Sequence, residues 1–166
     1  ADATRMPYRM HAEYLRRLYL DNDLATGRLL VDGRPVALQN LRLPLFAVGT
    51  ERDHVAPWRS VYKIHALADT DVTFVLTSGG HNAGIVSEPG HPHRHYRIAT
   101  RRHDDVRISP DEWVEQAKSC EGSWWESWVA WLDGHSTGRV APPAMGDAAA
   151  GLAPVADAPG TYVLQR

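Results

Sequence analysis

The sequence has little cysteine, little net charge and no long hydrophobic run. Its single cysteine, Cys120, excludes an internal disulfide framework and fits a reducing cytoplasm. A formal net charge of -2 gives no reason to expect nucleic acid or a charged membrane surface as a partner. No apolar run reaches the roughly 18 residues of a membrane span, and the basic-then-apolar start of a signal peptide is missing. The remaining composition, 43% hydrophobic and 23% charged over 166 residues, is typical of one soluble globular domain.

Two short apolar runs, each followed by a turn that contains glycine, organise the middle of the chain. Residues 45–48 and 72–76 show no polar alternation, as expected of strands covered on both faces of a parallel sheet. The amphipathic run 57–69 between them predicts a single crossover helix that begins at Pro57. A strand–helix–strand unit of this length implies two neighbouring parallel strands and a right-handed crossover. The predicted fold class is therefore α/β.

Each of these strands is followed by one side chain that is suited to catalysis. Asp53 follows the first and His81 the second, 28 residues later, so both are expected at the carboxyl edge of the sheet. The order acid then histidine is that of the last two triad members in an α/β-hydrolase-type fold. An aspartate after a strand also caps helices or forms turns with its own backbone, and a loop histidine is often only a loop histidine. The joint placement favours catalysis, with Asp53 fixing the tautomer of a His81 base.

The remaining segments are predicted from local patterns. Apolar residues from Tyr8 onward recur at helical spacing, and Asp32-Gly33 is a tight-turn signal within a hairpin over residues 28–36. Residues 88–105 are expected to be polar and irregular. Capping boxes at Ser109 and Ser123 predict two C-terminal helices. We divide the chain into residues 1–40, with a helix and a hairpin, residues 41–138, the C-terminal half of an α/β-hydrolase-type core, and an extended tail, residues 139–166.

No residue of the chain fits the role of nucleophile. Cys120 lacks the first glycine of a nucleophile elbow, comes after the acid and the histidine, and is expected at the end of a helix. Ser78 also lacks an elbow and lies too near His81 in sequence to be aimed at it. The first residue is alanine rather than methionine, which is compatible with a processed or truncated start.

Two further groups of residues have a structural interpretation. His91, His93 and His95 alternate with other residues, but the neighbouring Arg94 opposes a cation and no cysteine or carboxylate completes a tetrahedral set. We therefore predict a solvated loop and no metal site. The tryptophans between residues 113 and 131 are expected to pack in the core, with an acyl-chain or partner surface as the alternative.

Five motifs in one order carry a family resemblance. The chain resembles the C-terminal portion of poly(3-hydroxyalkanoate) synthases, most closely those of class I, over nearly its whole length. The residues that carry it are Asp2-Ala3-Thr4, Tyr14-Leu15-Arg16 with Tyr19-Leu20, Gly49-Thr50-Glu51-Arg52-Asp53-His54-Val55-Ala56-Pro57-Trp58, Gly80-His81-Asn82-Ala83-Gly84, and Gly122-Ser123-Trp124-Trp125 with Trp128 and Trp131-Leu132. The departures are the histidine-rich loop around His91 and Asn82, which stands where an aliphatic residue is usual.

The resemblance implies the C-terminal part of an α/β-hydrolase fold, with residues 1–40 as the end of its cap region. It also implies an acyltransferase that polymerises (R)-3-hydroxyacyl-CoA into polyester with release of coenzyme A. It implies a Cys-His-Asp triad in which His81 is the base and Asp53 orients it. Trp58, Asn82 and His54 are the implied substrate-binding residues. The family cysteine lies upstream of the matched region, so the chain is expected to be nearly inactive by itself.

Other implications concern partners and location. No cofactor is expected, because the coenzyme A thioester is a substrate. The expected partners are the upstream part of the same synthase and, in the full-length enzyme, a second copy of it. The expected location is the surface of cytoplasmic polyester granules. Two alternatives stay open: a non-catalytic granule-associated interaction module, and a fragment of an esterase or thioesterase of the same fold.

Overall fold

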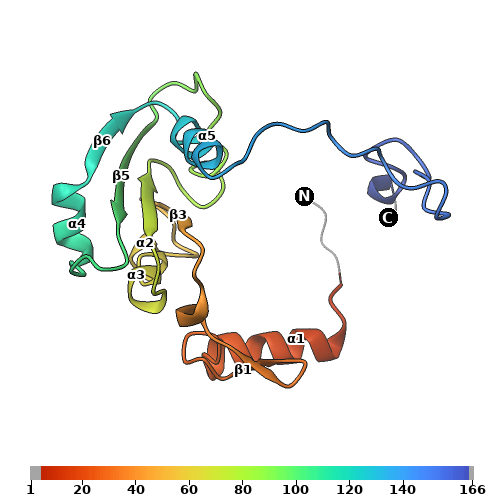
Figure 1. Ribbon diagram of the computed structural model, residues 1–166, viewed down its shortest axis with the longest axis horizontal. Helices are drawn as coiled ribbons and strands as arrows, with labels where there is room; N and C mark the ends of the chain where they lie inside the picture. The colour runs from red at the N-terminus through yellow and green to blue at the C-terminus, as the bar shows by residue number, and fades with distance from the viewer. Residues whose placement is uncertain (1–4, 165–166) are drawn as a thin grey trace.

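The computed structural model describes residues 5–164, and Asp2-Ala3-Thr4 of the family motifs lie outside these residues. Figure 1 shows a helix and a hairpin at the N-terminal end, then a sheet with helices on both faces, then a C-terminal segment that leads away from the sheet. The larger sheet has four strands in the order β3-β4-β5-β6. They are β3 (Leu45–Thr50), β4 (Val72–Thr77), β5 (His95–Arg101) and β6 (Lys118–Glu121).

The N-terminal elements follow the predicted pattern. Helix α1 (Tyr8–Tyr14) continues as a π-helical segment, Leu15–Leu20, and the hairpin pairs β1 (Leu29–Val31) with β2 (Arg34–Val36). Asp32 and Gly33 have φ values of 48° and 73°, the left-handed backbone that this kind of hairpin turn requires. A short 3-10 helix, Leu38–Asn40, then leads to the larger sheet.

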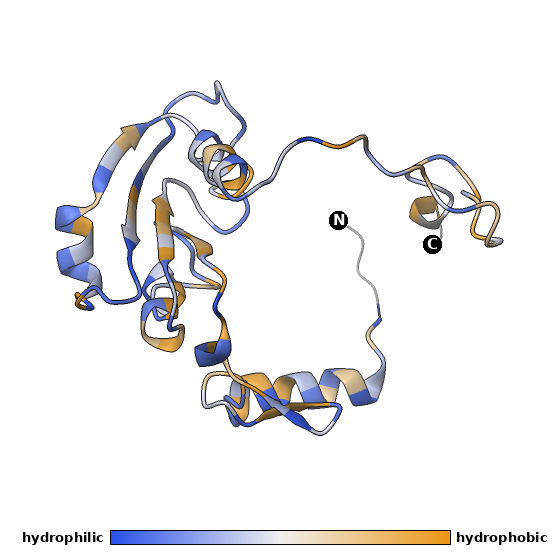
Figure 2. Ribbon diagram, in the orientation of Figure 1, coloured by the Kyte–Doolittle hydropathy of each residue, from blue (hydrophilic) through white to orange (hydrophobic). Residues whose placement is uncertain are grey.

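The parallel pair predicted from the two apolar runs is confirmed. β3 and β4 pair in parallel, with Leu45 opposite Val72 and Thr50 opposite Thr77. All six residues of β4 are buried, including Thr73 and Thr77, as expected of a strand without polar alternation that is covered on both faces. Both strands therefore end at the same edge of the sheet. Figure 2 shows hydrophobic residues along β3 and β4 and mainly hydrophilic ones on α4 (Pro110–Gln116).

The crossover between these strands differs from the single helix predicted. It consists of two four-residue helices, α2 (Trp58–Val61) and α3 (Ile64–Leu67). Hydrogen bonds of the 3-10 type, from an N–H to the carbonyl three residues earlier, tighten the backbone at the junction. An example is the bond from the His65 N–H to the Tyr62 carbonyl. At this junction the buried rings of Tyr62 and His65 pack together, with ring centroids 4.4 Å apart.

The second half of the sheet corrects two expectations. Residues 95–101, predicted to be irregular, form β5, which pairs antiparallel with β4 along its whole length. β6 pairs antiparallel with β5 and contains Cys120, which lies on a strand and not at a helix end. The α/β class is confirmed, with a mixed sheet. In the sequence, the arginines and histidines of residues 88–105 obscure the alternation of polar and apolar residues that is typical of a strand. Tyr96 is nevertheless buried in the hydrophobic core.

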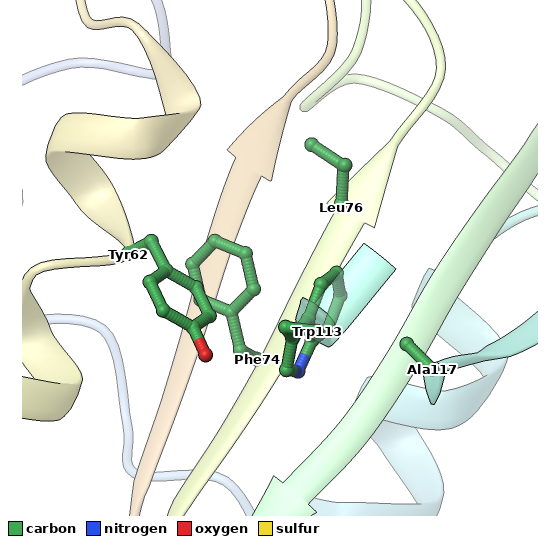
Figure 3. Packing of buried hydrophobic residues seen from close by; sticks show 5 residues of the cluster. All are labelled: Tyr62, Phe74, Leu76, Trp113 and Ala117. Atoms are coloured by element: carbon green, nitrogen blue, oxygen red, sulfur yellow. The ribbon is translucent and has the colours of Figure 1, made fainter. Parts of the chain in front are cut away.

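Hydrophobic clusters cover both faces of the sheet. On one face, Phe74 and Leu76 of β4 pack with Tyr62 from the crossover and with Trp113 of α4 (Figure 3). On the other face, Val75 packs with Tyr96 and Trp124, next to α5 (Trp125–Gly134). Successive residues of β4 thus serve opposite faces, as the period of a strand requires. The prediction that the tryptophans pack in the core is confirmed for Trp113 and Trp124, which are 4% and 6% exposed.

The C-terminal helices begin differently. Ser109 caps α4 with both reciprocal bonds of a capping box, as predicted. The second predicted box is wrong, because the residue before α5 is Trp124, which makes no side-chain cap. Ser123 Oγ accepts the backbone N–H of Trp125, but its hydroxyl donates to the Ser87 carbonyl instead of forming a reciprocal box. Beyond Arg139 the described residues are almost all exposed, with one bridge between Asp147 and Leu152 and a 3-10 helix, Tyr162–Leu164. Within residues 5–164, no helix is both long and apolar enough to cross a bilayer.

Candidate active site

The two residues singled out in the sequence meet beyond the carboxyl edge of the sheet. Asp53 lies three residues after the end of β3, and His81 lies four residues after the end of β4. The His81 Nδ1 atom and the Asp53 Oδ2 atom are 2.8 Å apart, which is hydrogen-bond distance. Because β3 and β4 are parallel and adjacent, their ends carry both side chains to one place.

The second carboxylate oxygen of Asp53 is held by its own turn. Asp53 Oδ1 accepts hydrogen bonds from the backbone N–H groups of Val55 and Ala56, each at 2.8 Å. The Asp53 side chain is only 7% exposed, whereas that of His81 is 47% exposed. Asp53 therefore stabilises its own turn through one carboxylate oxygen and contacts His81 through the other.

The charge of Asp53 follows from these contacts. The backbone N–H of Ala56, with the His81 ring and the N–H of Val55, lowers the pKa of Asp53 to about 2, against the opposing effect of burial. A carboxylate at neutral pH only accepts, so the hydrogen between the two side chains belongs to His81 Nδ1. In the neutral ring Nε2 then carries no proton and is free to accept one.

The loop that carries His81 is folded tightly against β3. The Arg52 N–H donates to the Gly79 carbonyl at 2.9 Å, and the Gly84 N–H donates to the Gly80 carbonyl at 2.9 Å. Gly79 has a φ of 108°, a conformation that glycine adopts far more readily than other residues. Gly84 is buried, and a methyl group on it would lie 2.5 Å from Thr50 Cγ2.

Replacement of Gly84 by alanine is therefore expected to destabilise this loop. The added methyl group would meet Thr50 and the Gly80 carbonyl, at 2.5 and 3.0 Å, so one side of the contact has to move. Overpacking of this kind costs about 1–3 kcal/mol. Urea unfolding of the chain is expected to show the loss as a lower midpoint, whereas Gly90→Ala, whose Cβ would meet nothing within 4 Å, tests the strain of a positive φ without a clash. Equal losses in the two variants would contradict the close-packing explanation.

A second carboxylate–imidazole pair stands next to the first and was missed in the sequence. Glu51 follows β3 directly, and its Oε1 lies 3.5 Å from Nε2 of His95, the first residue of β5. The Ser78 Oγ atom accepts the His95 N–H at 3.2 Å, which ties the start of β5 to the end of β4. No local signal separates His95 from the other histidines of its segment, because the pair depends on the antiparallel pairing of β5.

The three predicted substrate-binding residues lie close after Asp53 or His81 in the sequence. His54 is exposed in the turn after Asp53, and Asn82 is exposed directly after His81. Trp58 is half-buried: a Cβ on Gly49 would lie 3.0 Å from the Trp58 Cβ, and the Arg59 guanidinium lies 4.7 Å from its ring centroid. Their roles toward a substrate stay predictions.

Neither candidate nucleophile of the chain is aimed at His81. Cys120 faces the cluster of Val75 and Trp124, two strands away from β4. That separation is roughly 10 Å at ordinary strand spacing. Ser78 is 3% exposed and is occupied by its bond from His95. Among residues 5–164, no group of three or more metal-ligating side chains is present, and His91 is paired with Glu88 at 3.0 Å.

An α/β sheet with a carboxylate–imidazole pair beyond two adjacent parallel strands is the arrangement of α/β-hydrolase-type folds. Comparison with known proteins is more specific. Over 166 residues the chain is 37% identical to the poly(3-hydroxyalkanoate) polymerase subunit PhaC of Rhizobium etli and 39% identical to the poly(3-hydroxyalkanoate) polymerase of Methylorubrum extorquens. Over 98% of the chain it is 37% identical to the poly(3-hydroxyalkanoate) polymerase subunit PhaC of Cupriavidus necator.

These matches confirm the resemblance to poly(3-hydroxyalkanoate) synthases, and the chain corresponds to the C-terminal part of such polymerases. The chain spans about a quarter of the relatives it matches, between 25% and 27% of their length. No family model matches the chain.

Proposed function

We propose that this chain is the C-terminal catalytic segment of a poly(3-hydroxyalkanoate) synthase and supplies the histidine and aspartate of a Cys-His-Asp triad. The observation that carries the proposal is the 2.8 Å contact between His81 Nδ1 and Asp53 Oδ2, in a chain similar over its whole length to these polymerases. We further propose that the nucleophilic cysteine belongs to a part of the polymerase outside these 166 residues, since Cys120 is packed against Trp124.

The chemistry follows from the tautomer of His81. Its Nε2 takes the proton of the cysteine thiol, and the thiolate attacks the carbonyl carbon of (R)-3-hydroxyacyl-CoA. The carbon–sulfur bond to coenzyme A breaks, and the coenzyme A thiolate leaves with the proton held by His81. The enzyme then carries the acyl group as a thioester. The 3-hydroxyl of the next unit then loses its proton to His81 and attacks this thioester, so that an ester bond forms and the carbon–sulfur bond to the enzyme cysteine breaks. The cysteine leaves as a thiolate and takes the proton back from His81. The lengthened chain is then a coenzyme A thioester and is transferred to the cysteine again by the first step.

Asp53 contributes by charge and by position. Its carboxylate stays ionised and hydrogen-bonded to the ring, so it stabilises the imidazolium formed in each proton transfer. This scheme needs no metal and no cofactor other than the thioester substrate. We also propose that His54, Asn82 and Trp58, which flank the pair, contact the substrate, and that the full-length enzyme works as a homodimer at the surface of polyester granules.

The test is to place this chain in a complete enzyme. The matching segment of the Cupriavidus necator polymerase is replaced by this chain, and release of coenzyme A from (R)-3-hydroxybutyryl-CoA is followed with a thiol-reactive dye. We expect sustained release from the chimera and none above background from the 166-residue chain alone. Circular dichroism and size-exclusion chromatography establish that both are folded. A folded but inactive chimera would contradict the proposed function, and turnover by the chain alone would contradict an external nucleophile.

A further inference from the structure

Three side-chain donors from one short segment hold the loop that follows His81. The Trp124 indole N–H donates to the Gly84 carbonyl at 3.0 Å, and the Trp125 indole N–H donates to the Ile85 carbonyl at 2.9 Å. The Ser123 hydroxyl donates to the Ser87 carbonyl. The donors come from residues 36 or 40 positions away in the sequence, so the contacts bring the start of α5 onto the His81 loop.

The donors are themselves fixed to the sheet. Trp124 is 6% exposed, and its ring stacks on Phe46 of β3 with ring centroids 6.2 Å apart. The Trp125 ring lies edge-on to that of Trp124, with ring centroids 6.4 Å apart, and the backbone N–H of Trp125 donates to the Ser123 Oγ at 3.1 Å. The two indole N–H groups therefore project from a packed hydrophobic cluster and not from a mobile surface segment.

The accepting carbonyls belong to a loop with few other hydrogen bonds to the rest of the fold. Before His81, the Gly79 carbonyl accepts from Arg52, which fixes the loop to the end of β3. After His81, the turn bonds to Gly80 and Asn82 are internal to the loop, so they shape it without tying it to the sheet. The bonds from Trp124 and Trp125, with that from Ser123, tie this second half to the rest of the fold.

We propose that Trp124 and Trp125 are positioning residues for His81, which hold its loop at the distance from Asp53 that proton transfer requires. The inference rests on the proposed function of His81 as the base. The indole N–H groups donate to backbone carbonyls of the loop and not to the imidazole. Misplacement of a catalytic group by about 1 Å can cost a factor of 100 in rate, so loss of one of several anchors is expected to cost roughly tenfold.

The test compares three tryptophan-to-phenylalanine variants in the chimeric polymerase. Trp124→Phe and Trp125→Phe keep an aromatic ring and remove the donor. Trp128→Phe is the matched control, because Trp128 packs on Trp124 at 5.9 Å and, among the hydrogen bonds of residues 5–164, none comes from its indole. The measurements are kcat and KM for (R)-3-hydroxybutyryl-CoA per mole of folded enzyme, and amide hydrogen exchange of the peptide that covers residues 79–87.

We expect kcat to fall roughly tenfold in Trp125→Phe and at least as much in Trp124→Phe, with KM unchanged within twofold and faster exchange confined to residues 79–87. Trp128→Phe is expected to match the parent in all three measurements. Trp125 is the decisive position if Trp124→Phe fails to fold. A rise in KM alone, or a kcat no lower than that of the Trp128 variant, would overturn the inference. His81→Gln is measured alongside: if it stays active, the proposed function fails, and if it is inactive while both donor variants are normal, only this inference fails.

Discussion

His81→Gln in the chimeric polymerase is expected to lower kcat for coenzyme A release by a factor of about 10²–10⁴, the usual contribution of a general base. The glutamine amide can still donate a hydrogen bond to Asp53 Oδ2, so the buried carboxylate keeps a partner. What it cannot do is accept a proton at neutral pH. We therefore expect the loss in kcat, with thermal unfolding close to that of the parent.

His91→Gln is the matched control for this change. His91 Nδ1 lies 3.0 Å from Glu88 Oε1, so it too is an imidazole paired with a carboxylate, but through a residue only three positions away. Its replacement is expected to leave kcat within twofold. If His81→Gln and His91→Gln retained the same activity, His81 could not be the base.

The candidate pair could be predicted because it depends on local patterns and one topological rule. Residues 45–48 and 72–76 are mainly apolar and show no polar alternation, and the segment between them is long enough for a helical crossover. Adjacent parallel strands end at the same edge, so Asp53 and His81 had to be neighbours once the strands were recognised. The 2.8 Å contact adds the geometry that a linear pattern cannot supply.

The missed features depend on contacts between distant segments. The sequence of β6 has no apolar pattern that would predict a strand. It is a strand because it pairs with β5. The break between α2 and α3 follows from packing of Tyr62 and His65 under the sheet, which overrides a sequence period compatible with one helix. Ser123 fits a capping-box pattern, and its Oγ does accept the backbone N–H of Trp125, but its hydroxyl donates to the carbonyl of Ser87, 36 residues away. The distant partner of such a side chain cannot be read from the sequence.

The same limit applies to the tryptophans. Their spacing predicts a packed hydrophobic group, and Trp113 and Trp124 confirm it. The hydrogen bonds of Trp124 and Trp125 depend on where the His81 loop lies, and the sequence pattern of α5 contains no information about that loop. A residue that packs on the core with its ring can thus act on the candidate site with its N–H.

Asp53→Asn is expected to reduce kcat by a factor of about 10³–10⁴ while it leaves the turn in place. The asparagine carbonyl can still accept from Val55 and Ala56, but its amide then faces His81 as a donor. The ring has to accept at Nδ1 and therefore carries its proton on Nε2, where a base must have none. Activity of the chimeric polymerase with (R)-3-hydroxybutyryl-CoA, measured as kcat, checks this, and Asp53→Ala is expected to lose the turn as well.

Asp71→Asn is the control, because Asp71 accepts from Arg102 at 2.7 Å and from the His103 N–H at 2.9 Å next to the other end of β4. It is expected to keep the kcat of the parent.

The pH dependence of kcat is a further test of the role of Asp53. Since its pKa is lowered from 3.8 to about 2, its stabilising effect is fully present above pH 3.8 and is lost only as the pH falls toward 2. Between pH 5 and 9 the deficit of Asp53→Asn should therefore not follow the titration of Asp53, and a variant that regained parental kcat anywhere in that range would exclude control of the tautomer as the role of this carboxylate.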